Sequence, residues 1–257
     1  MKKTILSTLC FLLVSCFMFF ADAGTRIVVL GSSTKAGAGV SDSNRAWVNQ
    51  YRTYLQSIDP TNTVTNLAKG GYTTCAIMPT GTDPYNTGNH ILEVDTERNI
   101  TKALSLSPNA IIINMPTNDV SNGIPVATQM KHFATIIDLA KAAGVKVWIT
   151  TSQPHNFGEK YDGPYNEEHQ PDIWKQAARD QFKELTDSIL NKYGEYALDF
   201  YTPIATEDGY SFIRPEYDSG DGVHLNDAAH DILFNIVKNA NIPEIAGSTP
   251  VEISTTP

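Results

Sequence analysis

Five short apolar segments alternate with stretches of helical periodicity along most of this 257-residue chain. The segments are residues 26–30, 63–67, 110–114, 145–150 and 196–200, and most are rich in valine and isoleucine. Runs of this kind are typical of strands that are covered on both faces. Helical spacing follows Ser43 and recurs over residues 126–143, 172–193 and 226–238. The alternation predicts an α/β domain in which helices cover both faces of a five-stranded parallel sheet.

Residues 1–23 have the features of a signal peptide. A basic pair, Lys2 and Lys3, precedes an almost wholly apolar run, and Ala21-Asp22-Ala23 fits a signal peptidase site. We therefore expect a secreted or periplasmic protein that is cleaved near Ala23.

A lipoprotein anchored at Cys16 is a second interpretation, because Leu13-Val-Ser-Cys16 resembles a lipoprotein box. Against it, the apolar run continues after this cysteine, where a lipoprotein usually becomes polar. The run is at the short limit for crossing a bilayer, so no membrane span is expected in the mature protein.

The remaining chain shows no boundary between two cores and no internal repeat. We expect one domain over residues 24–244 and a disordered tail or linker over residues 245–257, which are rich in Ser, Thr and Pro. Cys75 is left without a partner in the mature chain, so it is expected to be a small buried residue. The formal net charge is -9 and no basic run stands out, which argues against nucleic acid and anionic membranes as partners.

Two segments far apart in the chain carry the residue types of a nucleophilic site. The first strand leads into a turn with Ser32 and Ser33, and Asp221-Gly-Val-His224 precedes the last helix. A serine hydroxyl is a poor nucleophile until a positioned histidine takes its proton. If the two segments meet, they supply a nucleophile, a base and an orienting carboxylate.

A nucleotide site at the same turn is less well supported. Glycines follow the first strand at Gly31, Gly37 and Gly39, but no Gly-Lys-Ser/Thr sequence comes after them. Asp42 stands where a dinucleotide-binding loop needs glycine.

Four blocks in the chain together resemble the SGNH, or GDSL, hydrolase family. The blocks are Leu30-Gly-Ser-Ser33, Asn66-Leu-Ala-Lys-Gly-Gly71, Pro116-Thr-Asn-Asp119 and Asp221-Gly-Val-His-Leu-Asn226. Each block is weak alone, but all four occur in the family's order. The resemblance covers residues 26 to about 240 and implies a flavodoxin-like three-layer α/β/α sandwich.

The resemblance implies a role for each matched residue. Ser33 would be the nucleophile, His224 the general base and then acid, and Asp221 the residue that orients the imidazole. The backbone N–H groups of Ser33 and Gly71 and the side-chain amide of Asn118 would form the oxyanion hole. The family pattern implies no metal and no cofactor.

The sequence departs from the family pattern at two positions. Ser32 replaces the usual aspartate of the first block, and Pro116 replaces the usual glycine of the third. Neither position has a covalent or proton-transfer role, so we expect activity to survive. The block alignment favours Ser33 over Ser32 as the nucleophile.

Two long irregular stretches, residues 72–90 and 153–170, follow the second and fourth predicted strands. Ligands of open α/β sheets bind at the carboxyl ends of the strands, so these stretches are candidate substrate loops. Asp119 is expected to fix its loop by hydrogen bonding, and Trp174 to lie in the core or in a pocket. Five other histidines show no metal-ligand spacing: His90, His132, His155, His169 and His230.

We expect from these observations an exported serine esterase that forms an acyl-enzyme on Ser33. Export and polar, aromatic loops favour an acetyl group on a carbohydrate as the substrate. The family also includes enzymes for lysophospholipids, short-chain esters and thioesters, and an alcohol could replace water as the acyl acceptor. A noncatalytic carbohydrate-binding surface protein with the same fold is the alternative of a different class.

Overall fold

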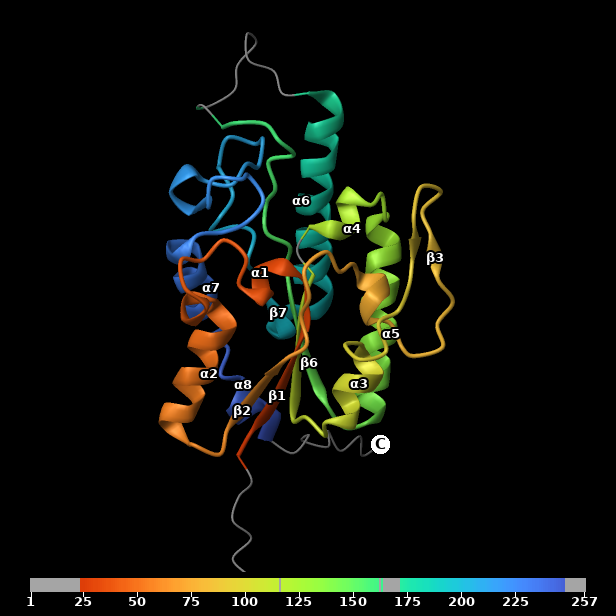
Figure 1. The fold of residues 1–257 in the computed structure, drawn as a ribbon, viewed down its shortest axis with the longest axis vertical. Helices are drawn as coiled ribbons and strands as arrows, with labels where there is room; N and C mark the ends of the chain where they lie inside the picture. Colours follow the sequence, from red (N-terminus) through yellow and green to blue (C-terminus); the bar gives the residue numbers. More distant parts are fainter. Residues whose placement is uncertain (1–23, 116, 162, 164–171, 248–257) are drawn as a thin grey trace, which may run out of the picture.

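The computed structural model describes residues 24–115, 117–161, 163 and 172–247 (Figure 1). The predicted signal peptide, Cys16, Pro116 and His169 lie outside the described residues.

A parallel five-stranded sheet forms the centre of the molecule, as the alternation predicts. Its strands are β1 (Arg26–Gly31), β2 (Thr63–Asn66), β5 (Ala110–Asn114), β6 (Lys146–Thr150) and β7 (Ala197–Leu198). They lie in the order β2-β1-β5-β6-β7 and every adjacent pair is parallel. After β1, the chain adds β2 on one side of β1 and then crosses to form β5 on the other side. The neighbouring strands β1 and β5 therefore mark a topological switch point, and ligands bind at such points in folds of this kind.

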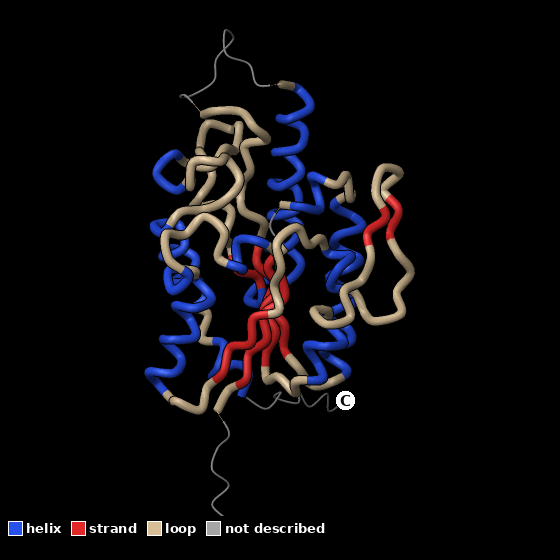
Figure 2. Tube along the Cα trace, in the orientation of Figure 1, coloured by secondary structure: helices blue, strands red, loops and turns tan. Residues whose placement is uncertain are grey.

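Helices cover both faces of the sheet (Figures 1 and 2). One layer contains α2 (Trp47–Ile58), α7 (Asp227–Asn239) and the short α8 (Ile242–Gly247). The other contains α3 (Ile100–Ser105), α5 (Val126–Ala142) and α6 (Ile173–Tyr193). The three-layer α/β/α class is therefore confirmed.

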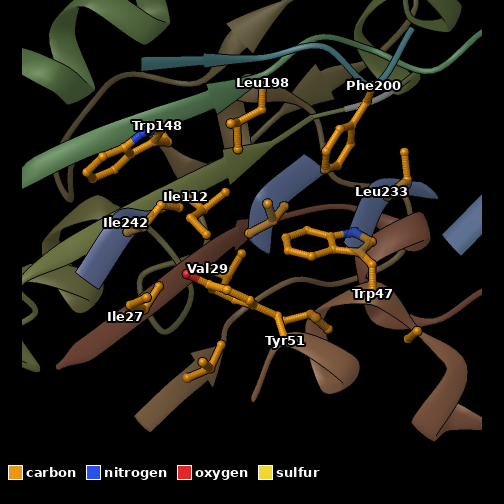
Figure 3. Packing of buried hydrophobic residues seen from close by; sticks show 14 of the residues in the cluster. Ile27, Val29, Trp47, Tyr51, Ile112, Trp148, Leu198, Phe200, Leu233 and Ile242 are labelled. Carbon is orange, nitrogen blue, oxygen red and sulfur yellow. The ribbon is translucent and has the colours of Figure 1, made fainter. Parts of the chain in front are cut away.

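Side chains alternate along each strand between the two layers, as a pleated sheet requires. Ile27 and Val29 pack with α2 and α7, whereas Val28 and Leu30 pack with α3 and α5. Figure 3 shows the first of these cores, in which the fully buried Trp47 meets Phe200 edge to face at 5.6 Å.

Short elements carry the loops at the carboxyl ends of the strands. These are α1 (Ser33–Ala36) after β1, α4 (Asn118–Ser121) after β5, and a hairpin of β3 (Tyr85–Asn86) and β4 (Ile91–Leu92) in the long stretch after β2. Single-turn 3-10 helices lie at Ser43–Arg45, Thr74–Ile77, Gly194–Tyr196 and Pro215–Tyr217.

The structure departs from the sequence predictions in two places. The predicted tail begins inside α8, which runs to Gly247 and buries Ile242 against the sheet, while residues 248–257 lie outside the described part. The long stretch after β2 contains the hairpin rather than being irregular throughout. Among the residues that the structure describes, no helix is long and apolar enough to cross a membrane.

Candidate active site

Ser33 and His224 are adjacent although 191 positions separate them in the chain. Ser33 begins α1 directly after β1, and His224 lies in the loop before α7. His224 Nε2 lies 3.2 Å from Ser33 Oγ, which is within hydrogen-bond reach of a serine and its base. The two segments singled out in the sequence therefore meet in space.

Asp221 contacts the other ring nitrogen of His224. Its Oδ2 lies 2.6 Å from His224 Nδ1, while its Oδ1 accepts the backbone N–H groups of Val223 and His224. Burial acts to raise the pKa of Asp221, but the hydrogen bonds from His224 and Val223 outweigh it and hold the pKa at about 2. The carboxylate is therefore ionised and accepts a hydrogen bond from Nδ1–H, which leaves the lone pair of Nε2 directed at Ser33.

Gln153, which follows β6, links the two segments. It is 2 % exposed, accepts the hydroxyl of Thr34 at 2.5 Å and donates to the carbonyl of Val223. Thr34 follows the serine and Val223 precedes the histidine, so one buried amide sets the spacing between nucleophile and base.

Gly39 allows the chain after α1 to pack against the histidine loop. A Cβ atom there would lie 2.4 Å from the carbonyl oxygen of Leu225 and 2.9 Å from His224 Cβ, and the residue has φ +93°. Only glycine fits both constraints.

Asn118 extends the site to the end of β5. Its Nδ2 donates to Ser32 Oγ at 2.5 Å and to the carbonyl of Tyr72 at 2.9 Å. The carbonyl of Asn114 accepts the N–H of Ser32 at 3.2 Å, so the switch point between β1 and β5 brings the serine turn beside the asparagine.

Gly70 and Gly71 lie on the loop after β2, at the same carboxyl end of the strands as Ser33 and Asn118. Gly71 has φ +83°, a conformation that favours glycine, and a Cβ atom built there would meet nothing within 4 Å. A Cβ atom on Gly70 would lie 3.8 Å from Ser33 Cβ. The glycine pair therefore leaves open backbone next to the serine.

Asp119 holds the loops after β2 and β5 together. It is 3 % exposed and accepts the backbone N–H of Thr74 at 3.0 Å and its hydroxyl at 2.5 Å. Thr74 Oγ1 also lies 2.7 Å from His132 Nδ1 on α5. Burial raises the pKa of Asp119 to about 6, although the hydrogen bonds from Thr74 act in the opposite direction. The loop-fixing role expected for Asp119 matches these contacts.

The two serines of the first turn differ in their surroundings. Ser33 is half-buried and faces His224, whereas Ser32 is fully buried and accepts the Asn118 amide. This placement agrees with the choice of Ser33 as nucleophile. Nothing in the sequence indicated that Gln153 and Thr74 contribute to the site, or that Ser32 bonds Asn118.

Within the described ranges, no three His, Cys, Asp or Glu side chains group as metal ligands. Two other histidines instead accept backbone N–H groups through Nδ1: His155 from Phe157 at 2.7 Å and His230 from Trp47 at 3.1 Å. Burial lowers the pKa of each to about 4, which keeps both neutral.

Several solved structures share this fold. A putative acylhydrolase from Bacteroides fragilis is 20 % identical, with a TM-score of 0.55 over 86 % of this chain and 88 % of that one. A psychrotrophic esterase from Pseudoalteromonas sp., inhibited by monoethylphosphonate in that structure, is 15 % identical, with a TM-score of 0.54 over 84 % and 96 %. A two-domain esterase active on acetylated mannans is 14 % identical, with a TM-score of 0.50 over 88 % of this chain and 52 % of that one.

Comparison with curated protein sequences gave no match. The profile of the GDSL-like lipase/acylhydrolase family, in contrast, matches residues 29–232, which include all four sequence blocks. The chain therefore belongs to the GDSL-like lipase/acylhydrolase family.

Proposed function

We propose that this protein is an exported serine esterase that removes short acyl groups, acetyl above all, from a carbohydrate. The observation that carries the esterase proposal is the chain of contacts from Asp221 through His224 to Ser33. In this arrangement the imidazole takes the serine proton while the carboxylate stabilises the resulting imidazolium.

The reaction proceeds in two halves. Ser33 Oγ attacks the ester carbonyl as its proton passes to His224 Nε2. His224 then gives this proton to the alcohol oxygen as the bond between the carbonyl carbon and that oxygen breaks. The alcohol departs, and the acyl group remains bound to Ser33. Water attacks this acyl group with His224 again as base, and the acid departs as the serine regains its proton.

The oxyanion of each tetrahedral intermediate is assigned to the backbone N–H groups of Ser33 and Gly71 and to the Asn118 amide. The carbonyl of Tyr72 anchors one Nδ2 hydrogen, while the bond to Ser32 is the one that the amide would exchange for the oxyanion. Donors of this kind are worth about 2.7–4 kcal/mol each in the transition state.

The surroundings favour a polar alcohol over a lipid. A cavity of about 420 Å³ next to Asp221 is lined by Glu159, Tyr161 and Asp218, among others. An acyl chain or lipid tail would displace water from these polar groups, which is unfavourable. The similar fold of an esterase that acts on acetylated mannans is consistent with this substrate class.

Export rests on the leader-like residues 1–23, and lipid attachment at Cys16 is the variant of this proposal. Both keep the enzyme outside the cytoplasm, where polysaccharides are encountered.

The test is release of acetate from a panel of acetylated polysaccharides, compared with aryl esters of short and long acyl chains. We expect the highest kcat/KM on acetylated carbohydrate and no release by the Ser33→Ala variant. Preference for long-chain esters would indicate a lysophospholipase or thioesterase. Glycan binding without turnover or fluorophosphonate labelling would indicate a noncatalytic binding protein.

A further inference from the structure

A second cavity, of about 310 Å³, lies on the carboxyl side of the sheet between three segments. They are the turn of the β3–β4 hairpin, α4 with the residues after it, and the first turns of α6. Figure 1 shows α4 between α6 and the hairpin. Because α4 begins at Asn118 and rises by about 1.5 Å per residue, Asn122 lies about 6 Å along the helix from the proposed oxyanion donor.

The lining of this cavity is polar, and the described residues that form it include no Asp, Glu, Lys or Arg. Six of its residues carry hydroxyl, amide or imidazole groups: Thr87, Asn89, His90, Ser121, Asn122 and Gln181. Asn122 Nδ2 donates to the carbonyl of Asn118 at 2.8 Å, which keeps its Oδ1 available as an acceptor. Amides of this kind both donate and accept, as a polyhydroxylated ligand requires.

Trp174 supplies an exposed aromatic surface at the same cavity. Its side chain is 65 % exposed, although tryptophan is usually largely covered. The ring meets Phe157 edge to face at 5.7 Å, and the backbone N–H donates to Asp172 Oδ1 at 2.9 Å. The indole therefore packs on Phe157 while much of its surface faces solvent.

We propose that this cavity, the Trp174 cavity, is a subsite for an uncharged sugar residue of the substrate glycan. The proposal rests on the proposed esterase function, because the subsite positions the glycan whose ester reaches Ser33. The apolar C–H face of a pyranose packs on the indole, and its hydroxyls bond the amides and hydroxyls of the other walls.

Two other ligands fit these walls less well. An acyl chain would desolvate six polar side chains without bonding them. A uronic acid polymer would find no Lys or Arg among the described lining residues and would approach a protein of formal charge -9.

Tryptophan fluorescence tests the subsite without catalysis. The chain has three tryptophans, and Trp47 and Trp148 are both fully buried. Acrylamide quenching therefore reports mainly on Trp174. In the Ser33→Ala protein, mannopentaose or xylopentaose should protect this fluorescence from quenching, whereas pentagalacturonate should not.

A specificity ratio tests the subsite in the active enzyme. We expect Trp174→Ala to lower kcat/KM on acetylated polysaccharide, relative to kcat/KM on an aryl acetate, by about tenfold, which corresponds to the loss of one aromatic contact. Ile173→Ala is the matched control, because Ile173 is 88 % exposed, adjacent in sequence and not part of the lining. This control should leave the ratio unchanged.

Three results would overturn the proposal: no protection by neutral oligosaccharides, stronger protection by pentagalacturonate, or a Trp174→Ala defect confined to long-chain aryl esters. Aryl acetate turnover by the unmodified protein reports the esterase function separately. If that turnover is absent while sugar protection persists, the esterase proposal fails and the sugar site stands.

Discussion

Replacing Thr74 with valine tests how the loops after β2 and β5 are held together. The Thr74 hydroxyl bonds Asp119 Oδ1 at 2.5 Å and lies 2.7 Å from His132 Nδ1. Valine keeps the shape of threonine but removes the hydroxyl. The buried carboxylate then loses one partner while the two Thr74 N–H contacts remain.

The size of the effect depends on the charge of Asp119. Its pKa of about 6 makes it ionised at pH 8 and mostly protonated at pH 5 in the folded protein. A hydrogen bond to a charged group contributes about 1.5–3 kcal/mol and a neutral one about 1 kcal/mol. Thr74→Val should therefore lower the free energy of unfolding by about 1.5–3 kcal/mol at pH 8 and by about 1 kcal/mol at pH 5.

The sign agrees with linkage. A carboxyl whose pKa is raised in the folded state stabilises the fold at low pH, and this contribution is lost as pH rises through about 6. Because Thr74 lowers the pKa of Asp119, its removal raises that pKa further and increases the loss at high pH.

Urea unfolding followed by circular dichroism at both pH values measures this difference. Thr74→Ser, which keeps the hydroxyl, should lose less stability than valine and show little dependence on pH. Thr186→Val is a matched control, because Thr186 is 3 % exposed and its hydroxyl has no hydrogen-bond partner among the described residues. Equal losses for Thr74→Val at pH 5 and pH 8, or a loss no larger than that of Thr186→Val, would refute the reasoning.

Three further predictions concern the catalytic acid–base chain, acid stability and a buried ion pair. Asp221→Asn should lower kcat by about 10²- to 10⁴-fold in steady-state assays, because the amide no longer stabilises the imidazolium. Burial lowers the pKa of His230 to about 4, so the unfolded chain binds a proton at this residue before the folded protein does. Between pH 6.5 and pH 4 the free energy of unfolding should therefore fall by up to about 3 kcal/mol through His230. The free energy of unfolding of the His230→Gln variant, measured over the same pH range, should fall by less. Arg179→Met should cost about 3–5 kcal/mol in urea unfolding, since it leaves the carboxylate of Glu159, now 2.6 Å from Arg179, without its partner.

The sheet was predictable because its strands are covered on both faces and therefore consist of continuous apolar runs. The end of α5 was predictable too, since the helical spacing stops at residue 143 and Gly144, with φ +72°, follows the last turn. In contrast, the last residues of α8 lie in the segment whose Ser- and Pro-rich composition suggested a tail, and the packing of this helix through Ile242 depends on distant parts of the chain.

The residues that carry the proposed chemistry were found because they occur in recognisable short blocks. Their supports were not found, because each depends on a partner far away in sequence. Gln153 lies 119 positions from Thr34, and Thr74 lies 45 positions from Asp119. No local pattern indicates such pairs, and only the packed sheet brings them together.

Covalent labelling tests the central claim, that Ser33 is the nucleophile activated by His224. The proteins to compare by intact mass and peptide mapping, after treatment with a fluorophosphonate, are the unmodified chain, Ser33→Ala and Ser32→Ala. We predict one adduct on Ser33, absent from Ser33→Ala and retained in Ser32→Ala. An adduct on Ser32, or one that persists in Ser33→Ala, would contradict the claim.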